Sequence, residues 1–288
     1  MTYRTLGRTG LQVSRLALDA RRLPTHSVDG VVRADFDKSY ELIRAAVGAG
    51  VNYIDTAPLY CGGTSEMAVG AALKGIRPQV MVATKVPLGE KFGVVDGPSY
   101  RRYLETSLKS LGTDYVDVHQ FWSLGGDGFV NAQKQGILQA ALQAKAEGVV
   151  RHLGFSFHGS PDDLIFLAQQ RDFFDVAMVN HNVFDQSRHH ALEVAFQEGM
   201  GLVNMGALSS PGRPENPEFR TKATTQGWDA YRVAFKLVWQ NPSLATILTS
   251  FQGSLEVLKN TLAFALSEPR LSSEEAGLMA KIEPQPTY

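Results

Sequence analysis

Short apolar runs alternate with longer amphipathic segments along most of the chain. Helical periodicity fills the intervals between the short runs, for example in residues 35–50 and 99–112. Gly50 and Gly112 end these two segments, where glycine favours the end of a helix. Eight of the short runs have the length and apolar character of buried strands: residues 14–18, 51–55, 80–85, 115–122, 151–156, 176–180, 201–205 and 245–249.

Strands that alternate with helices predict a parallel sheet, because each crossover between parallel strands needs a helix. Eight such units in about 250 residues fit a (β/α)8 TIM barrel. An open doubly wound sheet would need a glycine-rich phosphate turn after its first strand, and G-x-G-x-x-G is absent there. Residues 6–14 contain a glycine turn and predict an N-terminal β-hairpin that plugs the bottom of the barrel. We expect residues 1–288 to form a single barrel domain.

Composition narrows the class of protein. The chain is 44% hydrophobic and 20% charged, as in a soluble globular protein, and its net charge of −1 predicts no attraction to nucleic acid or membrane surfaces. No apolar run approaches the roughly 18–20 residues of a membrane span. The single cysteine, Cys61, excludes an internal disulfide and a multi-cysteine metal site. With no signal-like N-terminus, we expect a cytoplasmic protein without a metal centre.

Candidate chemistry gathers at the ends of predicted strands. Asp55 ends the second strand, Tyr60 lies in the loop after it, and Lys85 ends the third strand. In a barrel of this kind the reacting groups sit at the C-terminal ends of the strands. A lysine beside an aspartate can lower a tyrosine's pKa, which would let Tyr60 exchange a proton at neutral pH. The alternative is a buried Asp–Lys pair that only ties two strands together.

Six stretches together resemble the aldo-keto reductase family: residues 3–16, 50–60, 65–73, 80–86, 107–118 and 152–161. "GFSFHGSP" and "NHNVFD" are most similar to a bacterial branch whose members often carry a C-terminal iron–sulfur segment, but no cysteine follows Cys61. The resemblance implies a (β/α)8 barrel that reduces aldehydes and ketones with NADPH through an Asp, Tyr, Lys and His tetrad. Asp55, Tyr60 and Lys85 match that tetrad, and Trp122 stands at the histidine position.

Two departures from the family pattern affect the expected site. Trp122 offers an N–H donor but no titratable proton. Strand alternation turns His119 away from the barrel mouth and toward the helices, so it does not replace the missing histidine. Asp19 stands where the family has a glycine in its first strand. Two carboxylates in one pocket raise a pKa, which makes Asp19 a candidate general acid or base unless it is solvated or paired with Arg21 or Arg22.

The resemblance also implies positions for a nicotinamide cofactor. Lysine and arginine hold the 2′-phosphate in NADPH-selective members, whereas Ser250 and Glu256 stand at those positions here, and Lys259 could compensate. The choice between NADPH, NADH and no cofactor is therefore open. The expected cofactor-binding residues are Ser156, Asn180, Met205, Arg213, Ser250, Lys259 and Asn260.

These observations favour an aldo-keto reductase-like oxidoreductase that moves hydride between a nicotinamide and a small, perhaps sugar-like carbonyl or alcohol. Its catalytic residues would be Asp55, Tyr60, Lys85, Trp122 and Asp19. The first alternative is a non-redox lyase, dehydratase, isomerase or cyclase on the same barrel. The second is a silent binding protein like the channel-associated members of the family. The expected partner is a small-molecule substrate, and neither nucleic acid nor membrane.

Overall fold

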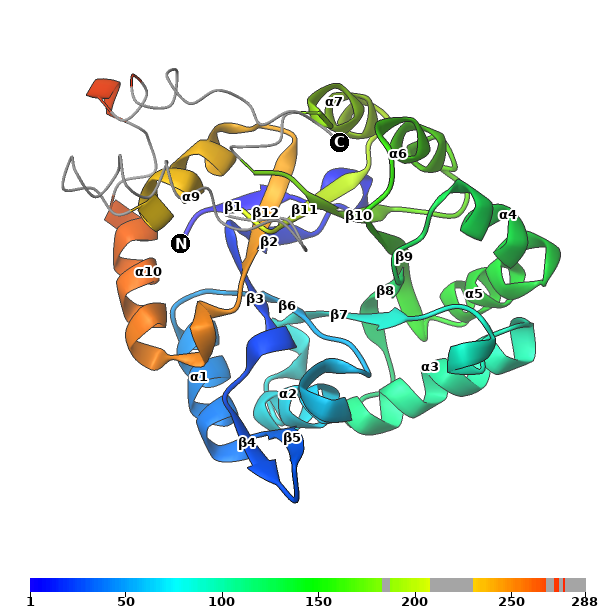
Figure 1. The fold of residues 1–288 in the computed structure, drawn as a ribbon, viewed down its shortest axis with the longest axis horizontal. Coiled ribbons are helices and arrows are strands. Elements are labelled where there is room, and N and C mark those ends of the chain that lie inside the picture. The colour runs from blue at the N-terminus through cyan, green and yellow to red at the C-terminus, as the bar shows by residue number, and fades with distance from the viewer. Residues whose placement is uncertain (183–186, 208–229, 268–271, 275–276, 278–288) are drawn as a thin grey trace.

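The computed structural model describes residues 1–182, 187–207, 230–267, 272–274 and 277. Eight parallel strands close into a barrel in the order β10-β11-β12-β3-β6-β7-β8-β9 (Figure 1). All eight predicted strands are confirmed, with ends shifted by at most two residues. The strands are β3 (Leu16–Asp19), β6 (Tyr53–Asp55), β7 (Met81–Val86), β8 (Val116–Phe121), β9 (Val150–Phe157), β10 (Val176–Asn180), β11 (Gly201–Met205) and β12 (Leu244–Thr249).

Helices surround the strands in Figure 1. The predicted helices at 35–50 and 99–112 are confirmed as the first and third of them. Asp35 and Asp96 cap their N-termini, and Gly112 ends the third in a left-handed conformation with φ 61°. The helices are α1 (Phe36–Gly48), α2 (Ser65–Leu73), α3 (Gly97–Leu111), α4 (Gly126–Lys134), α5 (Ile137–Ala146), α6 (Pro161–Ala168), α7 (His189–Gln197), α9 (Ala230–Gln240) and α10 (Leu255–Ser267).

Within the described ranges, no helix has both the length and the apolar character needed to cross a bilayer. That residues 1–288 form one domain stays a prediction.

The predicted N-terminal hairpin is confirmed. β1 (Tyr3–Thr5) pairs antiparallel with β2 (Gln12–Ser14), and a short 3-10 turn, η1 (Gly7–Thr9), joins them. Leu6 and Val13 are fully buried and pack against residues inside the barrel. Arg8 fixes the turn by donating from Nη1 to the Glu198 carbonyl at 2.9 Å. The hairpin therefore closes the end of the barrel at which the strands begin.

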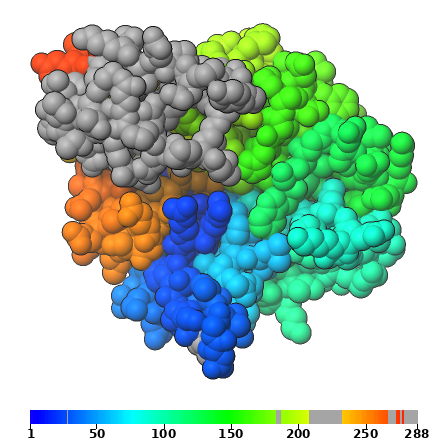
Figure 2. Space-filling model, viewed as in Figure 1, coloured from blue at the N-terminus to red at the C-terminus, as the bar shows by residue number. Residues whose placement is uncertain are grey.

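A second hairpin was not expected. β4 (Thr25–Val28) and β5 (Val31–Ala34) pair antiparallel around Asp29 and Gly30, whose φ values are 51° and 77°. An Asp-Gly pair with two positive φ values is a common hairpin turn, so the signal was present in the sequence. The hairpin lies outside the barrel beside α1 and α2 (Figure 1) and projects from the lower edge of the molecule in Figure 2.

The close packing of the N-terminal hairpin against the barrel predicts that a larger residue at position 201 destabilises the fold. A Cβ at Gly201 would lie 2.7 Å from Leu6 Cγ, so Gly201→Ala should reduce the free energy of unfolding by about 1–3 kcal/mol through overpacking. Gly48→Ala is the control, because nothing lies within 4 Å of the added Cβ near the end of α1. Chemical denaturation should show Gly48→Ala at least as stable as the wild type. Equal stability of both variants would contradict tight packing of the N-terminal hairpin against Gly201.

Candidate active site

A buried ion pair forms the floor of the candidate site. Asp55 and Lys85 end neighbouring strands β6 and β7, and each side chain is 1% exposed. Lys85 Nζ donates to Asp55 Oδ1 and, at 3.0 Å, to the Thr56 carbonyl. Gln120 on β8 donates from Nε2 to Asp55 Oδ2 at 3.1 Å. Both carboxylate oxygens are thus satisfied, which a buried charge requires.

Tyr60 lies directly over this pair. It begins η3 (Tyr60–Gly63), the turn that follows β6, and the Lys85 ammonium lies 4.8 Å from the centroid of its ring. Cys61 and Gly62 continue the turn with φ values of 49° and 63°. A Cβ at Gly62 would lie 1.9 Å from the Val32 carbonyl oxygen, so the second hairpin presses against this turn.

Burial decides the protonation states. It raises the pKa of Asp55 to about 6, although the Lys85 ammonium acts in the opposite direction. Burial alone would lower the pKa of Lys85, but the Asp55 carboxylate and Tyr60 hold it above its ordinary value. Burial also raises the pKa of Tyr60 to about 12, more than Lys85 lowers it. Lys85 lowers the pKa of Tyr60 as expected, but burial outweighs this effect. At neutral pH the site therefore holds a carboxylate, an ammonium and a protonated phenol.

Trp122 packs against Tyr60. The two rings meet edge to face, with centroids 5.5 Å apart and an interplanar angle of 81°. The backbone around Trp122 is held by both neighbouring strands: Trp122 N donates to the Val86 carbonyl at 2.9 Å, and Ser123 N donates to Ser156 Oγ at 2.8 Å. The indole therefore forms a wall of the barrel mouth beside the phenol.

His119 points the other way, as strand alternation predicts. Its Nδ1 is 2.8 Å from the hydroxyl of Tyr100 on α3, and the residue is 1% exposed. Burial lowers the pKa of His119 to about 3, so the ring is neutral. The expectation of a helix-facing histidine is confirmed.

Asp19 is the register partner of Asp55 across β3 and β6. Its Oδ1 accepts a hydrogen bond from the Arg21 backbone N at 2.9 Å. Burial raises the pKa of Asp19, despite that bond and the nearby positive charges of Lys85, Arg21 and Arg22. Within the described ranges, no cationic side chain lies within ion-pair distance of the Asp19 carboxylate. The structure thus places a second carboxylate next to the floor of the site.

Ser156, Asn180 and Met205 lie at or near the C-terminal ends of β9, β10 and β11. Asn180 Nδ2 is 2.9 Å from His158 Nδ1, whereas Asn180 Oδ1 is buried and has no hydrogen-bond partner among the described residues. A buried carbonyl oxygen without a donor is costly, and the amide N–H of a carboxamide would satisfy it. The nicotinamide end of a cofactor fits this position.

The other end of the expected cofactor site lies at β12 and α10. Ser250 Oγ accepts from Gln252 N at 3.3 Å in η6 (Phe251–Gly253). Glu256, Lys259 and Asn260 are exposed in the first half of α10. Arg213 lies outside the described residues. Lys259 and Asn260 could therefore bind a phosphate of the cofactor, whereas the Glu256 carboxylate would repel it.

The sequence profile of the aldo/keto reductase family matches residues 25–277. The chain belongs to this family. It is an oxidoreductase of the aldo/keto reductase type, and the assignment made from the sequence is confirmed at this level.

Relatives of this aldo/keto reductase include L-galactose dehydrogenase of Arabidopsis thaliana, 28% identical over 90% of this chain and 87% of that one. Methylglyoxal reductase YeaE of Escherichia coli is 25% identical over 85% of this chain and 84% of that one. The solved aldo-keto reductase of Klebsiella pneumoniae in complex with NADPH has the same fold, with a TM-score of 0.78 and 21% identity over 100% of this chain and 98% of that one.

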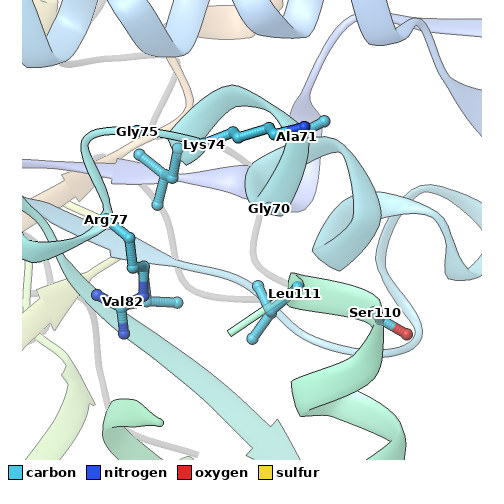
Figure 3. A pocket seen from close by; sticks show the side chains of 10 residues that line it. Gly70, Ala71, Lys74, Gly75, Arg77, Val82, Ser110 and Leu111 are labelled. Atoms are coloured by element: carbon cyan, nitrogen blue, oxygen red, sulfur yellow. The ribbon is translucent and has the colours of Figure 1, made fainter. Parts of the chain in front are cut away.

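Figure 3 shows a further pocket, of about 420 Å³, with the side chains that line it. Gly70, Lys74, Arg77 and Leu111 are among its lining residues, from the C-terminal ends of α2 and α3 and the turn before β7. Because the helices run opposite to the strands, these ends lie at the bottom of the barrel, remote from Tyr60. The pocket therefore lies at the opposite end of the barrel from the candidate site.

Two contacts in the mouth were not predicted from the sequence: Gln120 with Asp55, and His158 with Asn180. Strand alternation turns both Trp122 and Gln120 into the barrel. The sequence could therefore have predicted that Gln120 faces the site, where it contacts Asp55. The bond between His158 and Asn180 could not be predicted, because the two residues follow different strands and meet only through loop geometry.

The raised pKa of Asp55 predicts how the stability of the folded protein depends on pH. Its pKa is about 6 in the folded protein and about 4 in an unfolded chain, so the folded state binds more protons between these values. The contribution of Asp55 to stability is therefore full below about pH 4 and is lost as the pH rises through about 6. Plotted against pH from 4 to 7, the unfolding free energy of the wild type minus that of Asp55→Asn should fall. Asp114→Asn, which removes an exposed carboxylate, is the control, and a flat Asp55 difference would contradict the raised pKa.

Proposed function

We propose that this aldo/keto reductase moves hydride between a nicotinamide cofactor and a small carbonyl compound or alcohol, sugar-like substrates included. The observation that carries the proposal is the buried Asp55–Lys85 pair, whose ammonium faces the Tyr60 ring at 4.8 Å. Two relatives support the substrate class through their names, L-galactose dehydrogenase and methylglyoxal reductase. Placement in the iron–sulfur-related branch rests only on the wording of residues 154–161 and 180–185.

The proton chemistry follows from the charges in the site. A nicotinamide, when bound, supplies or accepts the hydride. Tyr60 is protonated at neutral pH and donates its proton to the carbonyl oxygen as that atom gains negative charge. Lys85 stabilises the phenolate that remains, and Asp55 keeps Lys85 charged. In the reverse direction the Tyr60 phenolate takes the proton of the alcohol.

Trp122 replaces the imidazole of the family tetrad with an indole. Its N–H can donate to the substrate oxygen but cannot release a proton, so Tyr60 carries the proton transfer alone. The apolar faces of the indole shape the pocket beside the phenol and exclude water from it. This arrangement favours substrates that bind by contact with an aromatic wall.

Residues of the barrel mouth would hold the cofactor. Ser156 and Asn180 would bind the carboxamide, and Met205 would pack on the ring. Ser250, Lys259 and Asn260 would contact the adenosine end, with Arg213 at the pyrophosphate. Glu256 would repel a 2′-phosphate.

One observation favours the alternative, a non-redox acid/base function. Asp19 lies next to Asp55, and burial raises its pKa, as a proton-transfer group in a lyase or isomerase would need. None of the relatives named above is described as a lyase. Titration with NADH and NADPH separates the two functions: micromolar binding supports hydride transfer, and no binding at millimolar cofactor supports the alternative.

Removal of the phenol tests the main proposal. Tyr60→Phe should lower kcat for aldehyde reduction by about 10²–10⁴-fold, because the positioned acid is lost while the ring and its packing remain. Tyr115→Phe is the matched control, since Tyr115 precedes β8 at the bottom of the barrel. Steady-state kinetics measure kcat, and cofactor binding measured in parallel shows whether the variant still binds the cofactor. An active Tyr60→Phe enzyme would exclude Tyr60 as the acid.

Substitution of the indole tests the role of Trp122. Trp122→His should raise turnover on simple aldehydes, because it restores a titratable donor beside Tyr60. Trp122→Phe keeps an aromatic wall without the N–H and should lower turnover. Rates that are unchanged in both variants on every aldehyde tried would show that Trp122 is remote from the chemistry.

The residues at the expected 2′-phosphate position predict weak discrimination between NADPH and NADH. We expect the wild type to favour NADPH over NADH, or the reverse, by less than about tenfold, or roughly 1.4 kcal/mol. Ser250→Lys combined with Glu256→Arg should raise the affinity for NADPH and leave that for NADH nearly unchanged, because the new charges face only the 2′-phosphate. Fluorescence titration measures both. A strong native preference for NADPH would show that other cations bind the 2′-phosphate.

A further inference from the structure

Gln120 is a fully buried amide at the floor of the barrel mouth. It lies on β8 as the register partner of Lys85 on β7, and none of its surface is exposed. Its Nε2 donates to Asp55 Oδ2 at 3.1 Å, across the strand that carries Lys85. Lys85 donates to the other oxygen of the same carboxylate. Asp55 is thus held between a cation on one oxygen and a neutral amide on the other.

The opposite end of this amide contributes nothing to stability. Gln120 Oε1 is buried and accepts no hydrogen bond from any described residue. A buried carbonyl oxygen without a donor destabilises a fold, and an apolar side chain of similar length would fill the same space without that cost. Packing therefore does not account for an amide at this position, and its one polar contact is the bond to Asp55.

The other groups around Asp55 do not favour its negative charge. Burial raises its pKa to about 6, and Asp19, its register partner on β3, adds to the rise. Tyr53 lies two residues earlier on the same face of β6, and burial holds its pKa well above the ordinary value. Tyr60 above the site has a pKa of about 12. Both phenols are therefore neutral near pH 7, and only Lys85 and Gln120 favour the carboxylate.

We propose that Gln120 is a positioning residue for the hydride transfer, because its amide keeps the Asp55 carboxylate ionised and turned toward Lys85. Lys85 then retains its opposite charge, and its ammonium stabilises the phenolate that Tyr60 becomes when it gives up its proton. Gln120 acts only through Asp55. This inference rests on the proposed function, since it assigns one more residue to the same reaction.

Gln120→Met tests the inference without turnover, because methionine keeps the length of the side chain and removes the donor. At pH 5 Asp55 is largely protonated, and the variant should be at least as stable as the wild type, since the unpartnered oxygen is gone. The pKa of Asp55 should be higher in the variant by about one pH unit. A higher folded pKa means a larger loss of stability as the pH rises, so the variant should become less stable than the wild type toward pH 8. Chemical denaturation at pH 5 and pH 8 measures the difference.

Two further variants guard this test. Val118→Ala is the matched control, because Val118 lies two residues earlier on the same face of β8 and is fully buried inside the barrel. It removes packing but no donor, so its loss of stability should be the same at pH 5 and pH 8. Gln120→Asn keeps an amide but shortens its reach by one methylene, and it should shift the balance in the same direction as Gln120→Met.

Kinetics separate a positioning role from a structural one. For aldehyde reduction, a shift of about one pH unit lowers kcat of Gln120→Met about tenfold at pH 5 and less than about twofold at pH 8, with little change in KM. A structural defect would not recover at high pH.

The stability measurement keeps this test separate from the proposed function. A stability difference that grows with pH in the Gln120 variants, and not in Val118→Ala, supports the inference even if no aldehyde is reduced. A difference independent of pH in both Gln120 variants would overturn it and leave the proposed function to the Tyr60→Phe test. An unchanged pH profile of kcat in an enzyme that does reduce aldehydes would overturn it as well.

Discussion

The proposed chemistry of this barrel depends on keeping the buried Lys85 ammonium charged. A buried ammonium is stable only with an opposite charge and with its donors satisfied. Asp55 provides the charge from the neighbouring strand, the Thr56 carbonyl takes a second hydrogen bond, and Gln120 occupies the remaining oxygen of Asp55. Three adjacent strands of a closed barrel hold these groups, so their positions are fixed by backbone hydrogen bonds and not by flexible loops.

That pair sets the character of Tyr60. Desolvation raises the pKa of the phenol, and the ammonium beneath it limits the rise, so Tyr60 holds a proton at neutral pH next to a charge that can stabilise the phenolate. The position of the ring depends on a turn with two successive positive φ values, against which the second hairpin packs. Thr64 Oγ1 accepts from Ala34 N at 2.8 Å and joins the hairpin to the same turn. The peripheral hairpin thus helps to hold Tyr60, the proposed acid, in place.

Trp122 and Asp19 lie in different layers of the barrel mouth. Trp122 forms an aromatic wall beside Tyr60, and hydrogen bonds to both neighbouring strands hold the backbone around it. Asp19 adds a carboxylate beside Asp55 and caps the turn that carries Arg21 to the rim. One aspartate therefore sets both the charge near the floor and the backbone conformation at the edge of the mouth.

The sequence by itself determined the barrel. Alternating apolar and amphipathic runs located all eight strands, because burial on both faces of a parallel strand imposes a local pattern. It also located Asp55, Lys85 and Trp122 at or next to strand ends, with Tyr60 in the loop after the second strand. His119 was turned toward the helices correctly, since alternation along a strand is local as well. Only the tertiary structure decided the direction of the Tyr60 pKa shift and the contact between His158 and Asn180. Desolvation and contacts between loops depend on which distant segments meet, and no local pattern records that.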